Sequence, residues 1–208
     1  MIFSLIRIAV IMLSLLSAQA WAEKPVVLLL GDSLSAAYNI APTRSWPHYL
    51  QERIPQYTLV NRSISGATTA QGLALLPDAL KQHKPAIILL ELGANDGLQG
   101  KPLTLIEENL SQLIQLAKSQ SENVLLIGIR LPPNLGKRYT EGFYAVYERL
   151  AQRYKIPLVP FLLEGVAADA SLMQADGLHP TEAAQQRVLA NVWPLLTPML
   201  AAAEAKHK

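Results

Sequence analysis

The stretch VVLLLGDSLS, residues 26–35, joins an uninterrupted apolar run to a glycine and two serines. Five consecutive apolar residues without alternation are typical of a parallel strand that is buried on both faces. Gly31 then permits a tight turn, which we expect to place Ser33 where a helix begins. Backbone N–H groups at a helix start are unpaired, so a serine there suits nucleophilic attack beside an oxyanion site.

The same stretch also has a simpler interpretation. Serine is a common helix cap, and Gly31-Asp32-Ser33 is ordinary turn chemistry, so a purely structural role fits these residues as well. The segment also differs from the G-x-S-x-G elbow of α/β-hydrolases, because Ser35 stands in place of the second glycine.

Beyond this stretch, short apolar runs alternate with longer amphipathic segments. Strands are predicted at residues 26–30, 58–60, 86–92, 124–129 and 157–159. Helices are predicted at residues 46–54, 70–83, 103–119, 140–154 and 181–203. This order predicts an α/β fold, a three-layer α/β/α sandwich around a parallel sheet with right-handed crossovers. In such sheets the functional crevice lies beyond the carboxyl ends of the strands.

Composition limits the kinds of protein that fit. The chain has 208 residues, of which 50% are hydrophobic and 16% charged, and it has no cysteine. This length suits one sizeable core and is short for two domains. The absence of cysteine excludes disulfides, thiolate metal sites and a cysteine nucleophile. A net charge of +2 is too small to indicate a nucleic-acid groove.

The N-terminal 22 residues have the pattern of a signal peptide. Seventeen of them are apolar and Arg7 is the only charged residue. The apolar run at residues 8–16 is shorter than the roughly 20 residues that a membrane-spanning helix needs. An A-x-A pattern ends at Ala22, which predicts cleavage there, with cleavage after Ala20 or an uncleaved anchor as alternatives. The mature chain, residues 23–208, is then expected to be a single exported domain without a lipid anchor, in the periplasm or secreted.

Two more predicted strands end in turn-rich segments. The strand at 58–60 is followed by Asn61-Arg62-Ser63-Ile64-Ser65-Gly66, and the strand at 86–92 by Gly93-Ala94-Asn95-Asp96-Gly97. Each segment alone fits a plain turn. If both lie at the crevice beside Ser33, the N–H groups of Ser33 and Gly66 and the Asn95 amide are three donors for one oxyanion. Asp96 is interpreted as a turn former and is given no catalytic role.

The C-terminal segment Asp176-Gly177-Leu178-His179-Pro180 is the most informative. A histidine base needs an acceptor for its second ring nitrogen, and an aspartate three residues earlier can supply it. A loop with a capping aspartate and a surface histidine is the alternative. His48, His83 and His207 are interpreted as surface or packing residues.

Taken together and in this order, the four segments resemble the SGNH (GDSL) hydrolases. Ser33, Gly66, Asn95 and His179 match the four letters of the name, and Asp176 matches the acid of the triad. The runs GDSLSAAY at 31–38, ELGANDGL at 91–98 and IRLP at 129–132 are similar to the exported bacterial branch of this family. One departure is Ala67, where an acidic residue is expected after the glycine, which puts the hydrogen bonding of that loop in doubt.

The resemblance implies a flavodoxin-like sheet of five parallel strands and hydrolysis of aryl esters, acyl thioesters and lysophospholipids without metal or other cofactor. It implies Ser33, Asp176 and His179 as the catalytic triad, and Ser33, Gly66 and Asn95 as the oxyanion hole. Loops at 97–102 and 131–139 are expected to border the acyl chain, with Gly97, Leu98, Leu131 and Pro132 as substrate-binding residues. The expected partner is a small acyl substrate, with neither nucleic acid nor a stable membrane anchor, and the protein is expected to be a monomer.

Two other functions remain as alternatives. A non-catalytic periplasmic module that binds an anion or a lipid would use the Gly/Ser loop after the first strand, but it gives no reason for the Asp176 and His179 pair, and the loop lacks a P-loop lysine. Metal-assisted phosphoester hydrolysis would use Asp32, Asp96, Asp176 and His179, but no second histidine has the spacing of a ligand.

Overall fold

The computed structural model describes residues 24–206, which form a five-stranded parallel sheet between two layers of helices. The strands have the order β2-β1-β3-β4-β5 across the sheet. The α/β/α sandwich predicted from the sequence is thereby confirmed. The predicted signal peptide, residues 1–22, lies outside the described residues.

The strands lie close to their predicted positions. Their bounds are β1 Val26–Gly31, β2 Thr58–Asn61, β3 Ile87–Glu91, β4 Val124–Ile127 and β5 Leu158–Val159. β1 and β3 form the centre and pair in parallel from Val27 with Ile87 to Gly31 with Glu91. All five residues of β3 are buried, which explains why its sequence is continuously apolar up to Glu91.

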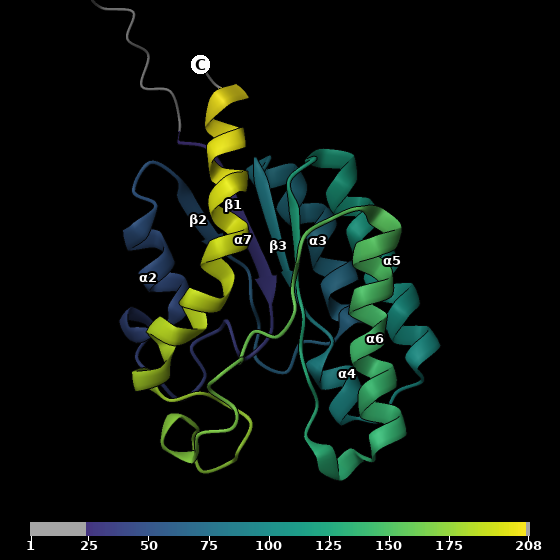
Figure 1. Cartoon of the computed structure of the whole chain (residues 1–208). Coiled ribbons are helices and arrows are strands. Elements are labelled where there is room, and N and C mark those ends of the chain that lie inside the picture. The colour runs from purple at the N-terminus through teal and green to yellow at the C-terminus, as the bar shows by residue number, and fades with distance from the viewer. Residues whose placement is uncertain (1–23, 207–208) are drawn as a thin grey trace, which may run out of the picture.

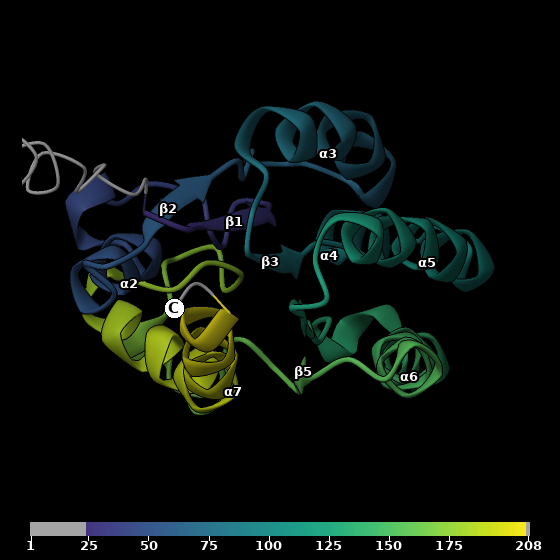
Figure 2. The same cartoon turned by 90° about the horizontal axis from the view of Figure 1, so that it is seen from above.

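Helices cover both faces of the sheet, as seen from above in Figure 2. α2 (Trp46–Arg53) and α7 (Gln185–Lys206) pack together on one face. α3 (Thr69–His83), α5 (Leu103–Gln120) and α6 (Lys137–Tyr154) form the layer on the other face. The helices bury apolar stripes against the strands, and the core continues through both layers.

Three local predictions were wrong. No helix begins at Ser33, because residues 33–39 form consecutive turns in which Ala37 and Asn39 have positive φ. Asn95 lies in a short helix, α4 (Ala94–Leu98), and not in a plain turn. The last helix begins at Gln185 after a 3-10 turn at Glu182–Ala184, four residues later than expected.

The segment Glu182–Ala205, which covers all of α7 except Lys206, is long and apolar enough to cross a membrane by length and composition alone. In the fold, however, Val188, Leu189 and Val192 have no exposed surface and belong to the core. One apolar face of α7 therefore packs in the core of the domain.

The segments that follow the strands gather at one end of the sheet, the lower end in Figure 1. β1 points toward this end, and the yellow-green segment between β5 and α7 lies there as well. The sheet therefore brings segments from residues 31–35, 61–67, 93–98 and 160–180 to one edge, as expected for a parallel α/β fold.

Candidate active site

Ser33 lies in the turn that leaves β1. The Asp32 carbonyl accepts hydrogen bonds from the N–H groups of Ser35 and Ala36, and Asp32 Oδ1 accepts one from the Leu34 N–H at 3.0 Å. Among residues 24–206, the Ser33 N–H has no protein acceptor. The turn therefore leaves the Ser33 N–H free, although no helix begins at this residue.

His179 contacts the serine directly. Its Nε2 lies 2.8 Å from Ser33 Oγ, and its Nδ1 lies 2.7 Å from Asp176 Oδ2. The ring of Tyr38 stacks beside the imidazole, with 4.3 Å between the ring centroids. Serine, histidine and aspartate are therefore connected in the order that a serine nucleophile, its general base and the group that orients the base require.

The loop before His179 holds Asp176 in its charged form. Asp176 Oδ1 accepts the N–H groups of Leu178 and His179 at 2.9 and 3.0 Å, and Gly177 supplies the positive φ that the turn needs. Partial burial raises the pKa of Asp176, but these hydrogen bonds and the contact with the His179 ring outweigh it and lower the pKa to about 2. Asp176 is consequently a carboxylate at neutral pH.

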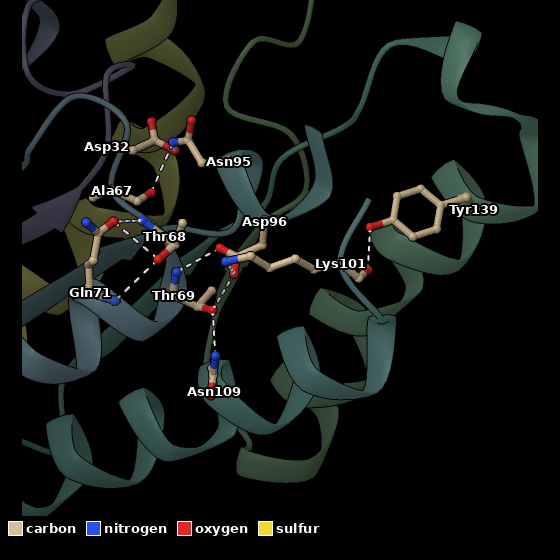
Figure 3. Close-up of polar contacts among 10 residues, drawn as sticks. All are labelled: Asp32, Ala67, Thr68, Thr69, Gln71, Asn95, Asp96, Lys101, Asn109 and Tyr139. Atoms are coloured by element: carbon tan, nitrogen blue, oxygen red, sulfur yellow. Dashed lines mark hydrogen bonds and ion pairs between the residues drawn. The ribbon is translucent and has the colours of Figure 1, made fainter. Parts of the chain in front are cut away.

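Gly66 places a free N–H at this end of the sheet, whereas both N–H bonds of the neighbouring Asn95 amide have acceptors within the protein. Gly66 is exposed with φ +82°, and its N–H has no acceptor among the described residues. Asn95 Nδ2 donates to the Ala67 carbonyl at 3.0 Å and to Asp32 Oδ2 at 3.3 Å (Figure 3). The loop with Ala67 therefore holds the Asn95 amide through its backbone, which needs no acidic side chain at that position.

Two acidic side chains are buried behind the serine. Asp32 and Glu91 have no exposed surface, and Glu91 Oε1 has no hydrogen-bond partner among the described residues. Glu91 Oε2 accepts the Ser35 hydroxyl at 2.7 Å and the Asp32 N–H at 3.2 Å. Burial raises the pKa of Asp32 to about 7 and raises that of Glu91 well above its usual value. Glu91 was not predicted, although it is the charged residue in an otherwise apolar strand.

Asp96 is more than a turn former. It is fully buried and accepts the Thr69 N–H at 2.7 Å, the Thr69 hydroxyl at 3.0 Å and the Lys101 ammonium at 3.2 Å (Figure 3). Tyr139 in turn donates its hydroxyl to the Lys101 carbonyl at 2.6 Å. Asp96 thereby joins α4, which carries Asn95, to the start of α3.

A partly open cavity of about 150 Å³ lies against Ser33 and His179. Of the four predicted substrate-binding residues, Leu98, Leu131 and Pro132 line it. Gly97 does not. It is buried under Leu131, and a Cβ at this position would lie 2.7 Å from the Leu131 methyl groups. Gly97 is therefore needed for the close packing of the wall.

The sequence did not single out several other residues of this wall. They are Leu34, Ala94, Ile129, Arg130, Leu163 and Leu178. Leu163 lies in an irregular segment after the two-residue strand β5, where no periodic pattern identifies it. Ile129 and Arg130 belong to the IRLP run at residues 129–132, and this run is the sequence signal that could have identified them as part of the cavity wall.

Within residues 24–206, no group of three or more His, Cys, Asp or Glu side chains has the arrangement of a metal site. Asp96 is paired with Lys101, whereas Asp176 contacts His179. The acidic residues that were considered as metal ligands therefore take part in separate contacts and do not form one cluster.

Comparison with known proteins identifies the family. The sequence pattern of the GDSL-like lipase/acylhydrolase family matches residues 29–187. The chain belongs to this family. The esterase TesA of Pseudomonas aeruginosa is 48% identical over 192 residues, which cover 90% of this chain and 94% of TesA. An arylesterase of Vibrio mimicus is 47% identical, covering 82% and 86% of the two chains.

A thioesterase 1/protease 1/lysophospholipase L1 of Escherichia coli is 46% identical over 79% of each chain. A crystal structure of TesA superposes with a TM-score of 0.81 and covers 84% of this chain and 99% of its own. The psychrotrophic esterase EstA from Pseudoalteromonas sp., in a structure inhibited by monoethylphosphonate, is 33% identical with a TM-score of 0.80 and covers 85% and 98%. As a member of the GDSL-like family, the chain is an enzyme that hydrolyses carboxylic ester and thioester bonds.

Proposed function

We propose that the chain cleaves small-molecule acyl esters and thioesters through an acyl-enzyme on Ser33. The observation that carries this proposal is the continuous contact from Asp176 through His179 to the Ser33 hydroxyl, at 2.7 and 2.8 Å. Aryl esters, acyl thioesters and lysophospholipids are the proposed substrates, in line with the names of the relatives.

The first half of the reaction forms the acyl-enzyme. His179 Nε2 accepts the Ser33 proton as Oγ attacks the carbonyl carbon, and the carboxylate of Asp176 holds the ring tautomer and stabilises the imidazolium. The N–H groups of Ser33 and Gly66 and the Asn95 amide are proposed to bind the negative oxygen of the tetrahedral intermediate. His179 then gives its proton to the leaving alcohol or thiol as the bond to that group breaks.

In the second half, water replaces the leaving group. His179 removes a proton from the water, whose oxygen attacks the acyl carbon, and the proton passes to Ser33 Oγ when the acid is released. No cofactor or metal takes part in this proposal. The lining of Leu98, Leu131 and Pro132 is proposed to contact the acyl chain, since it offers an apolar wall beside the nucleophile.

The decisive experiment measures hydrolysis of p-nitrophenyl esters and acyl thioesters of graded length by the purified protein. Ser33→Ala and His179→Ala are each expected to lower kcat by about 10⁴-fold or more. His48→Ala, at a histidine that pairs with Glu52 on α2, is the matched control and is expected to retain activity. Activity near the wild-type rate in either triad variant would refute the proposal, and EDTA is expected to leave the rate unchanged.

The alternative of a non-catalytic anion- or lipid-binding module predicts a different result. It expects tight binding of a phosphate or fatty acid with no turnover of any ester. The contact between Ser33 and His179 favours the enzyme, because a binding module has no use for a general base on its serine.

We also propose that residues 1–22 direct export, and that residues 23–208 act as a single domain in the periplasm or outside the cell. The A-x-A pattern that ends at Ala22 supports this proposal. The mature protein is proposed to be monomeric and without a membrane anchor. N-terminal sequencing of the exported protein is expected to begin at Glu23, and gel filtration is expected to give a single-chain mass.

A further inference from the structure

A second cavity of about 370 Å³ adjoins the one at Ser33. The two cavities share the wall residues Arg130, Leu131, Pro132, Leu163 and Leu178. The second cavity is also lined by Gly177, which lies two residues before His179. A ligand at Ser33 can therefore extend past the shared wall on the side of the histidine loop.

The side on which the leaving group departs indicates which part of the substrate the second cavity would hold. His179 must protonate the leaving atom, so the leaving group departs beside His179, whereas Asn95 and Gly66, the donors proposed for the carbonyl oxygen, do not line the second cavity. The second cavity lies along the loop of Gly177 and Leu178. It is consequently placed for the leaving group, and the cavity at Ser33, with Leu98 and Leu131 in its wall, is left for the acyl chain.

Arg130 gives this part of the site a positive charge. Among the described residues that line the cavity at Ser33, Arg130 and His179 are the two with a basic side chain. Its guanidinium carbon lies 4.3 Å from the centre of the Tyr144 ring and 5.8 Å from that of Phe161. These aromatic contacts, from α6 and from the segment after β5, hold the face of the planar guanidinium in place. They do not use the N–H groups, which lie at the edge of the guanidinium plane.

The donors of Arg130 are not used within the protein. None of the ion pairs or side-chain hydrogen bonds of residues 24–206 includes Arg130, and its side chain is exposed. Glu164 lines the second cavity too, but it does not pair with the guanidinium. An ordered cation with free donors suits a phosphate, which accepts two parallel N–H bonds from one guanidinium.

We infer that Arg130 and the second cavity form a subsite for a phosphate-bearing leaving group, and that this subsite makes the enzyme prefer acyl substrates whose alcohol or thiol is anionic. The inference rests on the proposed function and extends it. Two sources share this chemistry, the phosphates of a nucleotide-type acyl thioester and the phosphate of a lysophospholipid head group. Arg130 is a specificity residue and takes no part in the proton transfers.

The test compares substrates that differ only beyond the bond that breaks. Octanoyl-coenzyme A and octanoyl-N-acetylcysteamine carry the same acyl thioester, but only the first carries phosphates. Arg130→Gln is expected to lower kcat/KM for octanoyl-coenzyme A by about 10- to 100-fold, and to change the neutral thioester by less than about 3-fold. An octanoyl lysophospholipid, assayed in parallel, identifies which source of phosphate loses activity.

Arg53→Gln is the matched control, because it removes the same charge from an arginine that also lies over an aromatic ring, 4.9 Å from the centre of Trp193, and lines neither cavity. It is expected to leave both thioesters unchanged. Glu164→Gln is expected to raise kcat/KM for octanoyl-coenzyme A slightly, because it removes a repulsive charge. Added salt is expected to reduce the preference of the wild-type enzyme for the anionic thioester.

Equal losses on both thioesters in Arg130→Gln, or no loss on either phosphate-bearing substrate, would overturn the inference while the wild type still cleaves the neutral thioester. If the wild type cleaves neither the neutral thioester nor p-nitrophenyl octanoate, the proposed function itself fails. The two failures are therefore distinguished by the activity of the wild type on neutral substrates.

Discussion

Asp32 donates its backbone N–H to Glu91 Oε2 at 3.2 Å, both side chains have no exposed surface, and the peptide bond of Asp32 leads directly to Ser33. Burial raises the pKa of both carboxyl groups, and the charge of Asp32 raises that of Glu91 further, so the pair retains a proton near neutral pH. The charge of Asp96 also raises the pKa of Asp32, and all three carboxyl groups raise the pKa of the buried Tyr147 hydroxyl. Asp32 also contacts the Asn95 amide, which places the charge of the pair next to the proposed oxyanion site.

This pair predicts how stability depends on pH. Burial raises the pKa of Asp32 from 3.8 to about 7, so the folded chain binds more protons than the unfolded chain between these values. The contribution of Asp32 to the free energy of unfolding is therefore full below about pH 4 and is lost as the pH rises through about 7. Denaturant unfolding at pH 5 and pH 8 measures this loss, at about 1.4 kcal/mol for each unit of pKa difference.

Glu91→Gln is expected to reduce this pH dependence. The amide can accept the bonds from Ser35 and donate to the Asp32 carboxylate, which lowers the pKa of Asp32. Glu141→Gln, at an exposed residue that pairs with Lys137 on α6, is the control and is expected to keep the wild-type slope. The interpretation fails if Glu91→Gln and the wild type lose the same stability between pH 5 and pH 8.

The sequence predicted the proposed triad but missed the Asp32 and Glu91 pair, and this difference has a physical reason. Gly31, Ser33 and His179 stand at strand ends or in a short loop, where residue type and spacing indicate chemistry directly. The continuous apolar run before Glu91 predicts a buried strand. A pattern along one strand, however, cannot show that Asp32 of another strand end is the partner of Glu91. That contact depends on the pairing of Gly31 with Glu91 across the sheet, which is a property of the register.

The turn at Ser33 illustrates a second limit of sequence analysis. A helix was expected to begin at Ser33 because Gly31 permits a tight turn at the end of a buried strand. Here Ala37 and Asn39 adopt positive φ, and the chain reaches its first long helix only at Trp46. Neither residue is a glycine, so composition gave no sign of the extended turn.

Asp176→Asn is expected to lower kcat on the order of 10³-fold with little change in KM. The asparagine amide would present an N–H to His179 Nδ1, which favours the wrong ring tautomer for a base toward Ser33. Steady-state kinetics on p-nitrophenyl butyrate measures the effect. Asp169→Asn, which alters a local cap at Ser171 and removes no hydrogen bond to His179, is the control. A loss of less than about 10-fold would reduce Asp176 to a loop-forming residue.

Asn95→Ala is expected to lower kcat by about 10²- to 10³-fold, because the amide would be one of three donors to the oxyanion. KM is expected to change little, since the donor acts mainly on charge that develops in the transition state. Asn109→Ala, at an amide on α5 that bonds the Thr69 hydroxyl, tests for a general packing effect. An unchanged kcat in Asn95→Ala would leave Asn95 with its structural bonds to Ala67 and Asp32 alone.

Asp96→Ala is expected to lower the free energy of unfolding by about 3 to 5 kcal/mol, because it leaves Lys101 without its partner and removes two bonds to Thr69. Urea denaturation measures the change. Asp78→Ala, at an exposed position on the same helix as Thr69, is expected to stay within about 0.5 kcal/mol of the wild type. Similar values for both variants would contradict a role of Asp96 in joining α4 to α3.

Gly97→Ala tests which wall of the cavity holds the acyl chain. The added methyl group would lie 2.7 Å from the ends of Leu131 and 2.9 Å from Phe143, so Leu131 must move into the cavity. We expect kcat/KM for p-nitrophenyl decanoate to fall by roughly 10-fold or more, while that for the acetate changes little. Gly142→Ala makes a similar overlap with Leu103 away from Ser33 and is expected to preserve the chain-length profile. An equal loss on both esters in Gly97→Ala would place the acyl chain elsewhere, because a narrowed acyl cavity penalises long chains selectively.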